Sequence, residues 1–144
     1  SSVNSIGKRL FNNCTSLKSI ILPSSMTQIG SFSFNNCILL DNIEIPSSVT
    51  SIGEASFNGC KSLKEIFIPS SATHIESSSF SGCISLTNII IESSVIKIGC
   101  DAFNECSLLS EVILPPSVTS IGRGAFENCS SLAIVVIPKC VTDL

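Results

Sequence analysis

The sequence predicts a mainly β solenoid, in which the chain winds through stacked turns whose strands form parallel sheets. Two observations predict this fold class. Apolar residues recur every 23 residues with no insertion or deletion, and two apolar residues in each repeat alternate with a variable one, which is the side-chain period of a strand. A repeat of this length buries its apolar face only by stacking on its neighbours.

The repeat shows as columns of identical residues, which are expected to point into the core. The Phe column is Phe11, Phe34, Phe57, Phe80, Phe103 and Phe126. The Cys column is Cys14, Cys37, Cys60, Cys83, Cys106 and Cys129. Residues 1–144 are therefore expected to form one solenoid domain of about six repeats. Since the chain starts and stops inside a repeat without a recognisable polar cap, we expect a portion of a longer array.

The first element expected in each repeat is a strand with the spacing Leu-x-x-Ile-x-Ile, as in residues 63–68. Stacked copies of it predict a parallel sheet, because 23 residues leave enough chain for the crossover that parallel neighbours need. A Pro follows this strand in five repeats and marks where pairing stops, since Pro has no N–H to donate. Glu92 replaces the Pro once, which predicts a slightly longer fourth strand.

The second element expected is a short strand on the other side, typified by residues 49–52. A Gly follows it in five repeats, but Glu76 holds that place in one, so the backbone there is not expected to need a positive φ. The remainder of the repeat is short and rich in Asn, Ser and Gly, which favours turns or a 3₁₀ piece over a stable helix.

These motifs resemble the BspA-like class of leucine-rich repeat, whose unit is similar to LxxIxIPxSVTxIGxxAFxxCxx. The resemblance covers all 144 residues. It implies a right-handed solenoid with the main sheet on its concave side. The Asn ladder of commoner leucine-rich repeats has no counterpart here; the nearest residues are Ser25, Ser48, Ser71, Ser94 and Ser117.

The eight cysteines are compatible with a disulfide framework, a metal site or a set of nucleophiles, but their spacing argues against all three. The closest pair, Cys100 and Cys106, lies too far apart in sequence for a zinc motif and has no His nearby. Six of the eight occupy one repeat position, which favours a column of small buried side chains. Cys100 and Cys140 lie outside that column and, if exposed, would be the more reactive thiols.

The sequence indicates a protein that is not an enzyme and uses no cofactor or metal. His74, the only histidine, holds a variable turn position and is expected to face solvent. Asn13 and Asn128 each begin a glycosylation sequon that also follows from the repeat's own Asn-Cys-Ser pattern. The net charge is −3 and there is no Trp or Tyr, which disfavours nucleic acid as a partner. No apolar run is long enough for membrane insertion by this segment.

The informative positions are the variable ones that alternate with the inward residues of the main strand. Their second column is apolar in five of six repeats, whereas a purely solvated sheet face would be polar. Exposed apolar surface on a solenoid is typical of a partner site, although β-branched residues also simply favour strands. The predicted partner-binding residues are Ser19, Ile21, Asn42, Glu44, Glu65, Phe67, Asn88, Ile90, Glu111, Ile113, Ile134 and Val136.

The resemblance implies a protein-binding module of the adhesion or surface-antigen type, located at the cell surface or secreted, that binds extracellular-matrix or cell-surface proteins. The alternative is an intracellular scaffold or structural component of a larger assembly, in the cytoplasm. The absence of a recognisable signal segment and end-to-end self-association of uncapped repeats fit that alternative.

Overall fold

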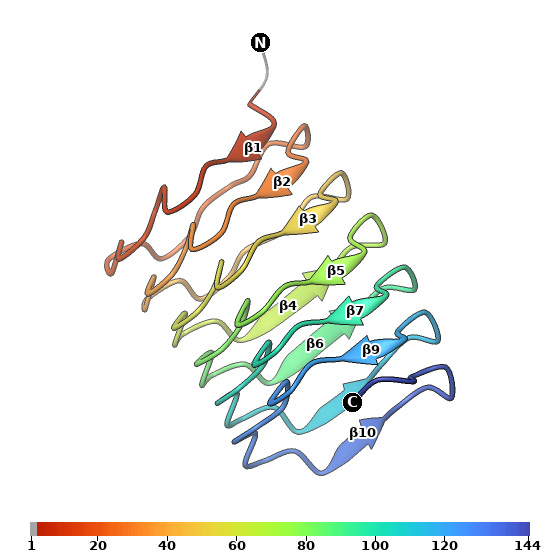
Figure 1. Cartoon of the computed structure of the whole chain (residues 1–144). Coiled ribbons are helices and arrows are strands. Elements are labelled where there is room, and N and C mark those ends of the chain that lie inside the picture. Colours follow the sequence, from red (N-terminus) through yellow and green to blue (C-terminus); the bar gives the residue numbers. More distant parts are fainter. Residues whose placement is uncertain (1–2) are drawn as a thin grey trace.

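The computed structural model describes residues 3–144 and confirms the mainly β solenoid. Ser1 and Ser2, which the predicted array includes, lie outside the described residues. Residues 3–144 form ten strands joined by turns, with no helix among them. The turns stack along one axis, and the first and last described turns lie at opposite ends of the stack (Figure 1).

One side of the stack carries a continuous six-stranded sheet, which we call the short-strand face. Each strand has two residues; the first is exposed, except for half-buried Ser120, and the second, an isoleucine, is buried. Neighbours pair in parallel and in the register set by the repeat, for example Gln28 with Ser51. In sheet order the strands are β1 (Ser5–Ile6), β2 (Gln28–Ile29), β3 (Ser51–Ile52), β5 (His74–Ile75), β7 (Lys97–Ile98) and β9 (Ser120–Ile121).

The opposite side, the long-strand face, carries the predicted main strands. They are β4 (Glu65–Ile68), β6 (Asn88–Ile91), β8 (Glu111–Ile113) and β10 (Ile134–Val136). They pair as β4 with β6 and β8 with β10, and Ser19 bridges Asn42 in the first two turns. The predicted parallel sheet is therefore present as successive pairs and not as one uninterrupted ladder in the described residues. Because the interior packing is continuous, the turns stay in register where this ladder is interrupted.

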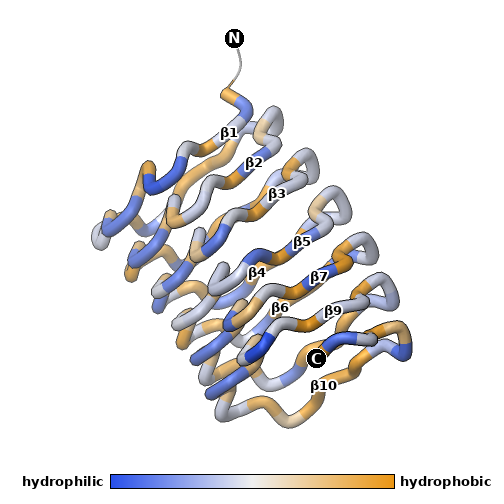
Figure 2. Tube along the Cα trace, viewed as in Figure 1, coloured by the Kyte–Doolittle hydropathy of each residue, from blue (hydrophilic) through white to orange (hydrophobic). Residues whose placement is uncertain are grey.

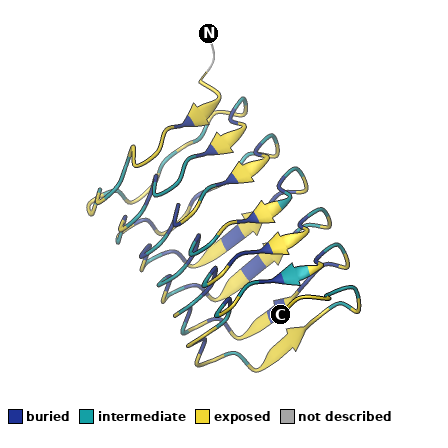
Figure 3. Ribbon diagram, in the orientation of Figure 1, coloured by how far each residue is buried: buried dark blue, intermediate teal, exposed yellow. Residues whose placement is uncertain are grey.

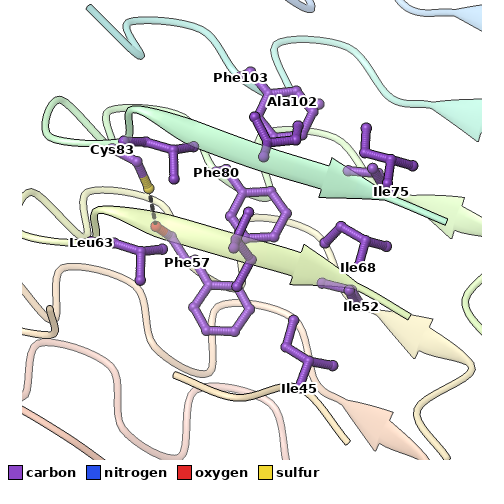
Figure 4. Packing of buried hydrophobic residues seen from close by; sticks show 14 of the residues in the cluster. Ile45, Ile52, Phe57, Leu63, Ile68, Ile75, Phe80, Cys83, Ala102 and Phe103 are labelled. Carbon is purple, nitrogen blue, oxygen red and sulfur yellow. Dashed lines mark hydrogen bonds between the residues drawn. The ribbon is translucent and has the colours of Figure 1, made fainter. Parts of the chain in front are cut away.

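The core is built from the predicted columns (Figure 4). The Phe rings of successive turns stack with centroids 5.2–5.5 Å apart, and Phe34, Phe57, Phe80 and Phe103 are fully buried. Figure 2 shows hydrophobic segments at corresponding places in successive turns. Burial of such a column removes a large apolar area from water in every turn.

Five thiols of the Cys column are buried as predicted, whereas Cys14 in the first turn is partly buried. The structure adds a role for the buried thiols. The Sγ of Cys83 donates to the backbone carbonyl of Phe57 at 3.3 Å, and the same bond recurs from Cys37, Cys60, Cys106 and Cys129. Each bond joins one turn to the preceding turn. A thiol here both fills space and supplies a weak donor to a buried carbonyl.

The Ser column that follows the main strand forms a side-chain ladder. Ser48 Oγ donates to the carbonyl of Met26 in the preceding turn at 2.6 Å. The equivalent bond is made by Ser25, Ser71, Ser94 and Ser117, and by the thiol of Cys140 in the last turn. These hydroxyls satisfy turn carbonyls that face no strand partner.

The glycine that follows each short strand is not in the left-handed region, as expected, and close approach explains its presence. A Cβ at Gly53 would lie 2.5 Å from the backbone N of Ser31. Left-handed backbone occurs instead at two later places in each turn, for example at Ala55 and Gly59. Residues outside the strands form turns, which agrees with the sequence.

Glu76, the residue that replaces this glycine, lies where two neighbouring turns, those of β3 and β5, pair less extensively. At the other turns the glycine N–H bonds the preceding short strand, as from Gly53 to the carbonyl of Ile29 and from Gly99 to that of Ile75. The pairing of β3 with β5, just before Glu76, is reduced to one residue pair, Ile52 with Ile75. A side chain at this crowded position therefore coincides with a local weakening of the ladder.

Two expectations of the sequence differ from the structure. Glu92 does not lengthen the strand that precedes it, since β6 has four residues, as β4 does. The N–H of Glu92 nevertheless donates to the carbonyl of Ile68, which a Pro could not do. Val135 and Ile137, expected to face inward, are 38% and 48% exposed. They belong to the last turn, which is stacked on one side only.

Candidate functional site

All twelve residues predicted on the outward side of the main strands are exposed. In β4 and β6 exposed and buried residues alternate strictly, because successive side chains of a strand point to opposite faces (Figure 3). Glu65 and Phe67 therefore face solvent, while Ile66 and Ile68 are buried. The outward residues form two parallel columns along the stack.

The second column forms what we call the apolar stripe, namely Ile21, Phe67, Ile90, Ile113 and Val136, with Glu44 between the first two. Exposed fractions in the stripe range from 46% for Phe67 to 96% for Ile21. Phe67 lies directly opposite Ile90, and Ile113 directly opposite Val136, in the paired strands. Since paired strands are about 4.8 Å apart, the two side chains of each pair form contiguous apolar surface.

The first column is mostly polar and lies beside the stripe. Glu65 is paired with Asn88, Glu111 with Ile134, and Ser19 with Asn42. Amides, a hydroxyl and carboxylates thus alternate along the stack next to the apolar side chains. This combination of an apolar strip and a polar border is the surface type that protein partners use.

The long-strand face is hollowed in three places that adjoin one another. A hollow of about 390 Å³ lies beside Ile21 and Glu44, one of about 320 Å³ beside Glu65 and Phe67, and one of about 530 Å³ beside Ile90 and Glu111. The first two share Asn42, Ile43 and Glu44, and the last two share Asn88 and Ile90. We call the three together the trough.

The sequence did not identify the residues at the rim of the trough. Ser24, Pro46 and Ser47 line the first hollow, and Thr87 and Ser110 line the third. The first three follow the main strand and the last two precede it, so the two-residue alternation of the strand does not apply to them. Their position next to the strand was the only available signal.

The remaining candidates do not assemble into a site. His74 is exposed as predicted, and its Nδ1 lies 2.9 Å from Oγ1 of Thr73. No group of three His, Cys, Asp or Glu side chains within residues 3–144 is arranged to hold a metal ion. Asn13 and Asn128 are both exposed, and glycan attachment at either stays a prediction.

All eight cysteines are free. Burial raises the pKa of the Cys37 thiol to about 11 and that of Cys106 to about 12, and it also raises the pKa of Cys60 and Cys83. These thiols therefore stay protonated and unreactive at neutral pH, because the thiolate is the nucleophile. Cys100 is exposed, whereas Cys140 is partly buried and its thiol donates to the carbonyls of Pro116 and Val118.

Within the described part of the chain, no helix has the length and apolar character needed to cross a bilayer.

Comparison with solved structures finds bacterial proteins of the same architecture. A leucine rich cell surface protein from Faecalibacterium prausnitzii A2-165 is 31% identical over 92% of this chain, with a TM-score of 0.84. A Leucine Rich Repeat protein of T. pallidum is 34% identical over 93% of this chain, with a TM-score of 0.85. A leucine-rich repeat protein from Bacteroides ovatus ATCC 8483 is 30% identical over 96%, with a TM-score of 0.72.

The chain spans 42%, 63% and 42% of the length of these three structures, respectively. A comparison with proteins of curated function finds no match. The family model described as the BspA type Leucine rich repeat region matches residues 1–108 and 33–144, in six copies. Together with the repeat register and the two-sided solenoid, this match shows that the chain belongs to the BspA-type leucine-rich repeat family.

Proposed function

We propose that this chain is a non-enzymatic protein-binding module of the adhesion or surface-antigen type, which binds extracellular-matrix or cell-surface proteins through its long-strand face. The observation that carries the proposal is the apolar stripe. Phe67, Ile90 and Ile113 are 46–60% exposed in neighbouring turns, although the fold does not need them there. Aromatic and aliphatic side chains of this kind supply the central anchors of protein interfaces.

Location at a cell surface is part of the same proposal. It is supported by the F. prausnitzii structure, which is that of a cell surface protein. The similarity covers 92% of the present chain and 42% of the F. prausnitzii chain. A solenoid also suits display, because each turn contacts only its neighbours and the outward columns stay free.

The experiment measures binding of the chain to a panel of immobilised extracellular-matrix proteins and to intact cells. We expect Phe67→Glu and Ile90→Glu to abolish binding, since each places a charge in the middle of the apolar stripe. The matched control is Ile96→Glu, because Ile96 is 44% exposed and lies on the short-strand side, next to β7. Circular dichroism and urea denaturation establish that all three variants are folded.

Binding that survives both stripe substitutions, or that Ile96→Glu reduces to the same extent, contradicts a role for the long-strand face. Binding to no member of the panel and to no cell type contradicts the adhesion role.

A second function, an intracellular scaffold that stacks end to end with further copies, is favoured by one observation. All eight thiols are free, and Cys100 is exposed, which suits a reducing compartment. Mass spectrometry of the native protein distinguishes the two functions: an oxidised Cys100 or a glycan on Asn13 contradicts the cytoplasm, and a concentration-independent mass in sedimentation contradicts stacking.

A further inference from the structure

The charges in the trough are of one sign. Among the twelve outward residues of the long-strand face there are three carboxylates, Glu44, Glu65 and Glu111, and no Lys, Arg or His. All three are exposed. Each hollow of the trough contains at least one of them beside an apolar side chain of the stripe.

The distribution of carboxylates follows the stack. Glu44 lines the first and second hollows, Glu65 the second, and Glu111 the third. Glu44 and Glu111 belong to turns three repeats apart, so they are separated along the stack by about 14 Å at a strand spacing of about 4.8 Å. A ligand that meets all three must therefore extend along the stack and cross the strands.

The lysines nearest the trough do not line it. Lys18 and Lys64 lie in a separate hollow of about 320 Å³ with Asp41, at the edge where the main strands begin. At the other edge, where the strands end, Glu92 adds a further half-buried acid. The trough is thus an apolar strip with acidic side chains, and none of the described residues that line it carries a positive charge.

From this charge pattern we infer that the partner segment bound in the trough is a protein segment in which Lys or Arg side chains alternate with apolar ones. The inference rests on the proposed function, because it assigns the chemistry of the ligand that the apolar stripe receives. Apolar side chains of the segment cover Phe67 and Ile90, and its cations lie within reach of Glu65 and Glu111. Complementary charges at an interface supply specificity and speed of association more than affinity.

A peptide library tests the inference, because random peptides sample every combination of charged and apolar side chains. A phage-displayed library of random linear dodecamers is selected on the immobilised chain at low ionic strength. We expect the selected peptides to be enriched in both Lys or Arg and aliphatic or aromatic residues. Binding of the synthetic peptides is expected to weaken as salt is added, since exposed charge pairs are screened.

Two triple variants with the same change in net charge make the test specific. Glu44→Gln, Glu65→Gln and Glu111→Gln together neutralise the trough, and we expect them to weaken the selected peptides about tenfold, as three exposed charge pairs would. The control combines Glu54→Gln, Glu105→Gln and Glu127→Gln, three exposed carboxylates outside the strands of the long-strand face. It is expected to leave affinity within about twofold, because distant charges are screened.

The outcomes separate this inference from the proposed function. If the selected peptides are acidic or uncharged, yet do not bind the Phe67→Glu variant, the inference of a basic partner segment is wrong. The proposal that the long-strand face binds proteins then still stands. Equal losses in the two triple variants overturn the charge assignment as well. A selection that yields no peptide dependent on Phe67 contradicts the proposed function itself.

Discussion

Three serines of the core occupy one repeat position and differ in whether their hydroxyls are hydrogen-bonded. Ser33, Ser56 and Ser79 are all fully buried, and Ala102 and Ala125 hold the same position in later turns. Ser79 Oγ donates to the carbonyl of Glu76. The hydroxyls of Ser33 and Ser56 have no hydrogen-bond partner among the described residues, so each carries the cost of desolvation without compensation.

We therefore expect Ser33→Ala and Ser79→Ala to change stability in opposite directions. Ser33→Ala removes an unsatisfied hydroxyl and should raise the free energy of unfolding by about 1 kcal/mol, whereas Ser79→Ala removes a bonded one and should lower it by about 1 kcal/mol. Urea denaturation of the two variants measures the difference. A change of the same sign in both would show that hydrogen bonding does not distinguish these serines.

The buried thiols predict a loss of stability in alkali. Burial raises the pKa of the folded Cys37 and Cys106 thiols from 9.0 to about 11 and about 12. Below pH 9.0 the thiol is protonated in both states and its contribution is fully present. As the pH rises from about 9 toward 11, the unfolded chain ionises first and the folded state loses its advantage.

Denaturation curves at intervals between pH 8 and pH 11 should therefore show a falling free energy of unfolding. Cys106→Ala is expected to make the fall less steep, and Cys100→Ala is the matched control because its thiol is exposed. The slope is the quantity to compare, since Cys106→Ala also changes packing. Equal slopes in the two variants would contradict a role for the buried thiols.

At the scale of the element, the glycine after each short strand decides how closely two turns approach. A Cβ on Gly53 would meet the Ser31 backbone N at 2.5 Å and the Gly30 carbonyl C at 2.8 Å, which only a backbone shift can relieve. A Cβ on Gly7, at the equivalent position of the first turn, would meet no described atom within 4 Å. Replacing glycine by alanine at both positions therefore isolates the effect of crowding between two turns.

We expect Gly53→Ala to lower the free energy of unfolding by about 1–3 kcal/mol, in the range of an overpacked core. Gly7→Ala should not lower it, because space is open and Ala loses less backbone entropy than Gly on folding. Thermal and urea denaturation of both variants provides the comparison. A similar fall in the free energy of unfolding at both positions would contradict the view that glycine is needed for close approach of the turns.

The elements also show what the sequence could and could not specify. The inward columns and the exposed residues of the main strands were predictable, because a period of two within a period of 23 residues fixes which side chains face inward. The first left-handed position of each turn was not, since Arg9, Phe32 and Ala55 share no side-chain property that signals a positive φ. Their conformation follows from hydrogen bonds with the next turn, such as that from Arg9 N to the Ser31 carbonyl.

The candidate site divides in the same way. Exposure of Phe67 and Ile90 follows from strand alternation, so the apolar stripe could be read from the sequence. The trough could not, because its rim includes residues before and after the strands, such as Ser24 and Ser110, to which strand alternation does not apply. The interrupted pairing between β6 and β8 was not predictable either, because both strands follow the same repeat pattern as the paired ones.

At the scale of the whole molecule, the solenoid is a one-dimensional stack whose stability is nearly a sum over turns and the contacts between neighbouring turns. The Phe column expresses this directly. Phe57 is fully buried and stacks on Phe34 at 5.2 Å and on Phe80 at 5.3 Å. Phe126 is half-buried and stacks on Phe103 alone, at 5.5 Å.

Truncation of the same residue type should therefore cost less at the end of the stack than in its interior. Phe57→Ala is expected to lower the free energy of unfolding by about 3–5 kcal/mol, the range for a buried aromatic residue, and Phe126→Ala by clearly less. Glu54→Ala is the control for the inward and outward assignment. Because Glu54 is exposed, the free energy of unfolding of this variant should be within about 0.5 kcal/mol of that of the parent.

Hydrogen exchange shows where in the stack each variant is destabilised. Phe57→Ala should speed amide exchange in the turns on both sides of residue 57, whereas Phe126→Ala should speed it only in the last turns. Uniform loosening by both variants would show that the stack unfolds as a single cooperative unit and that its nearest-neighbour description is wrong.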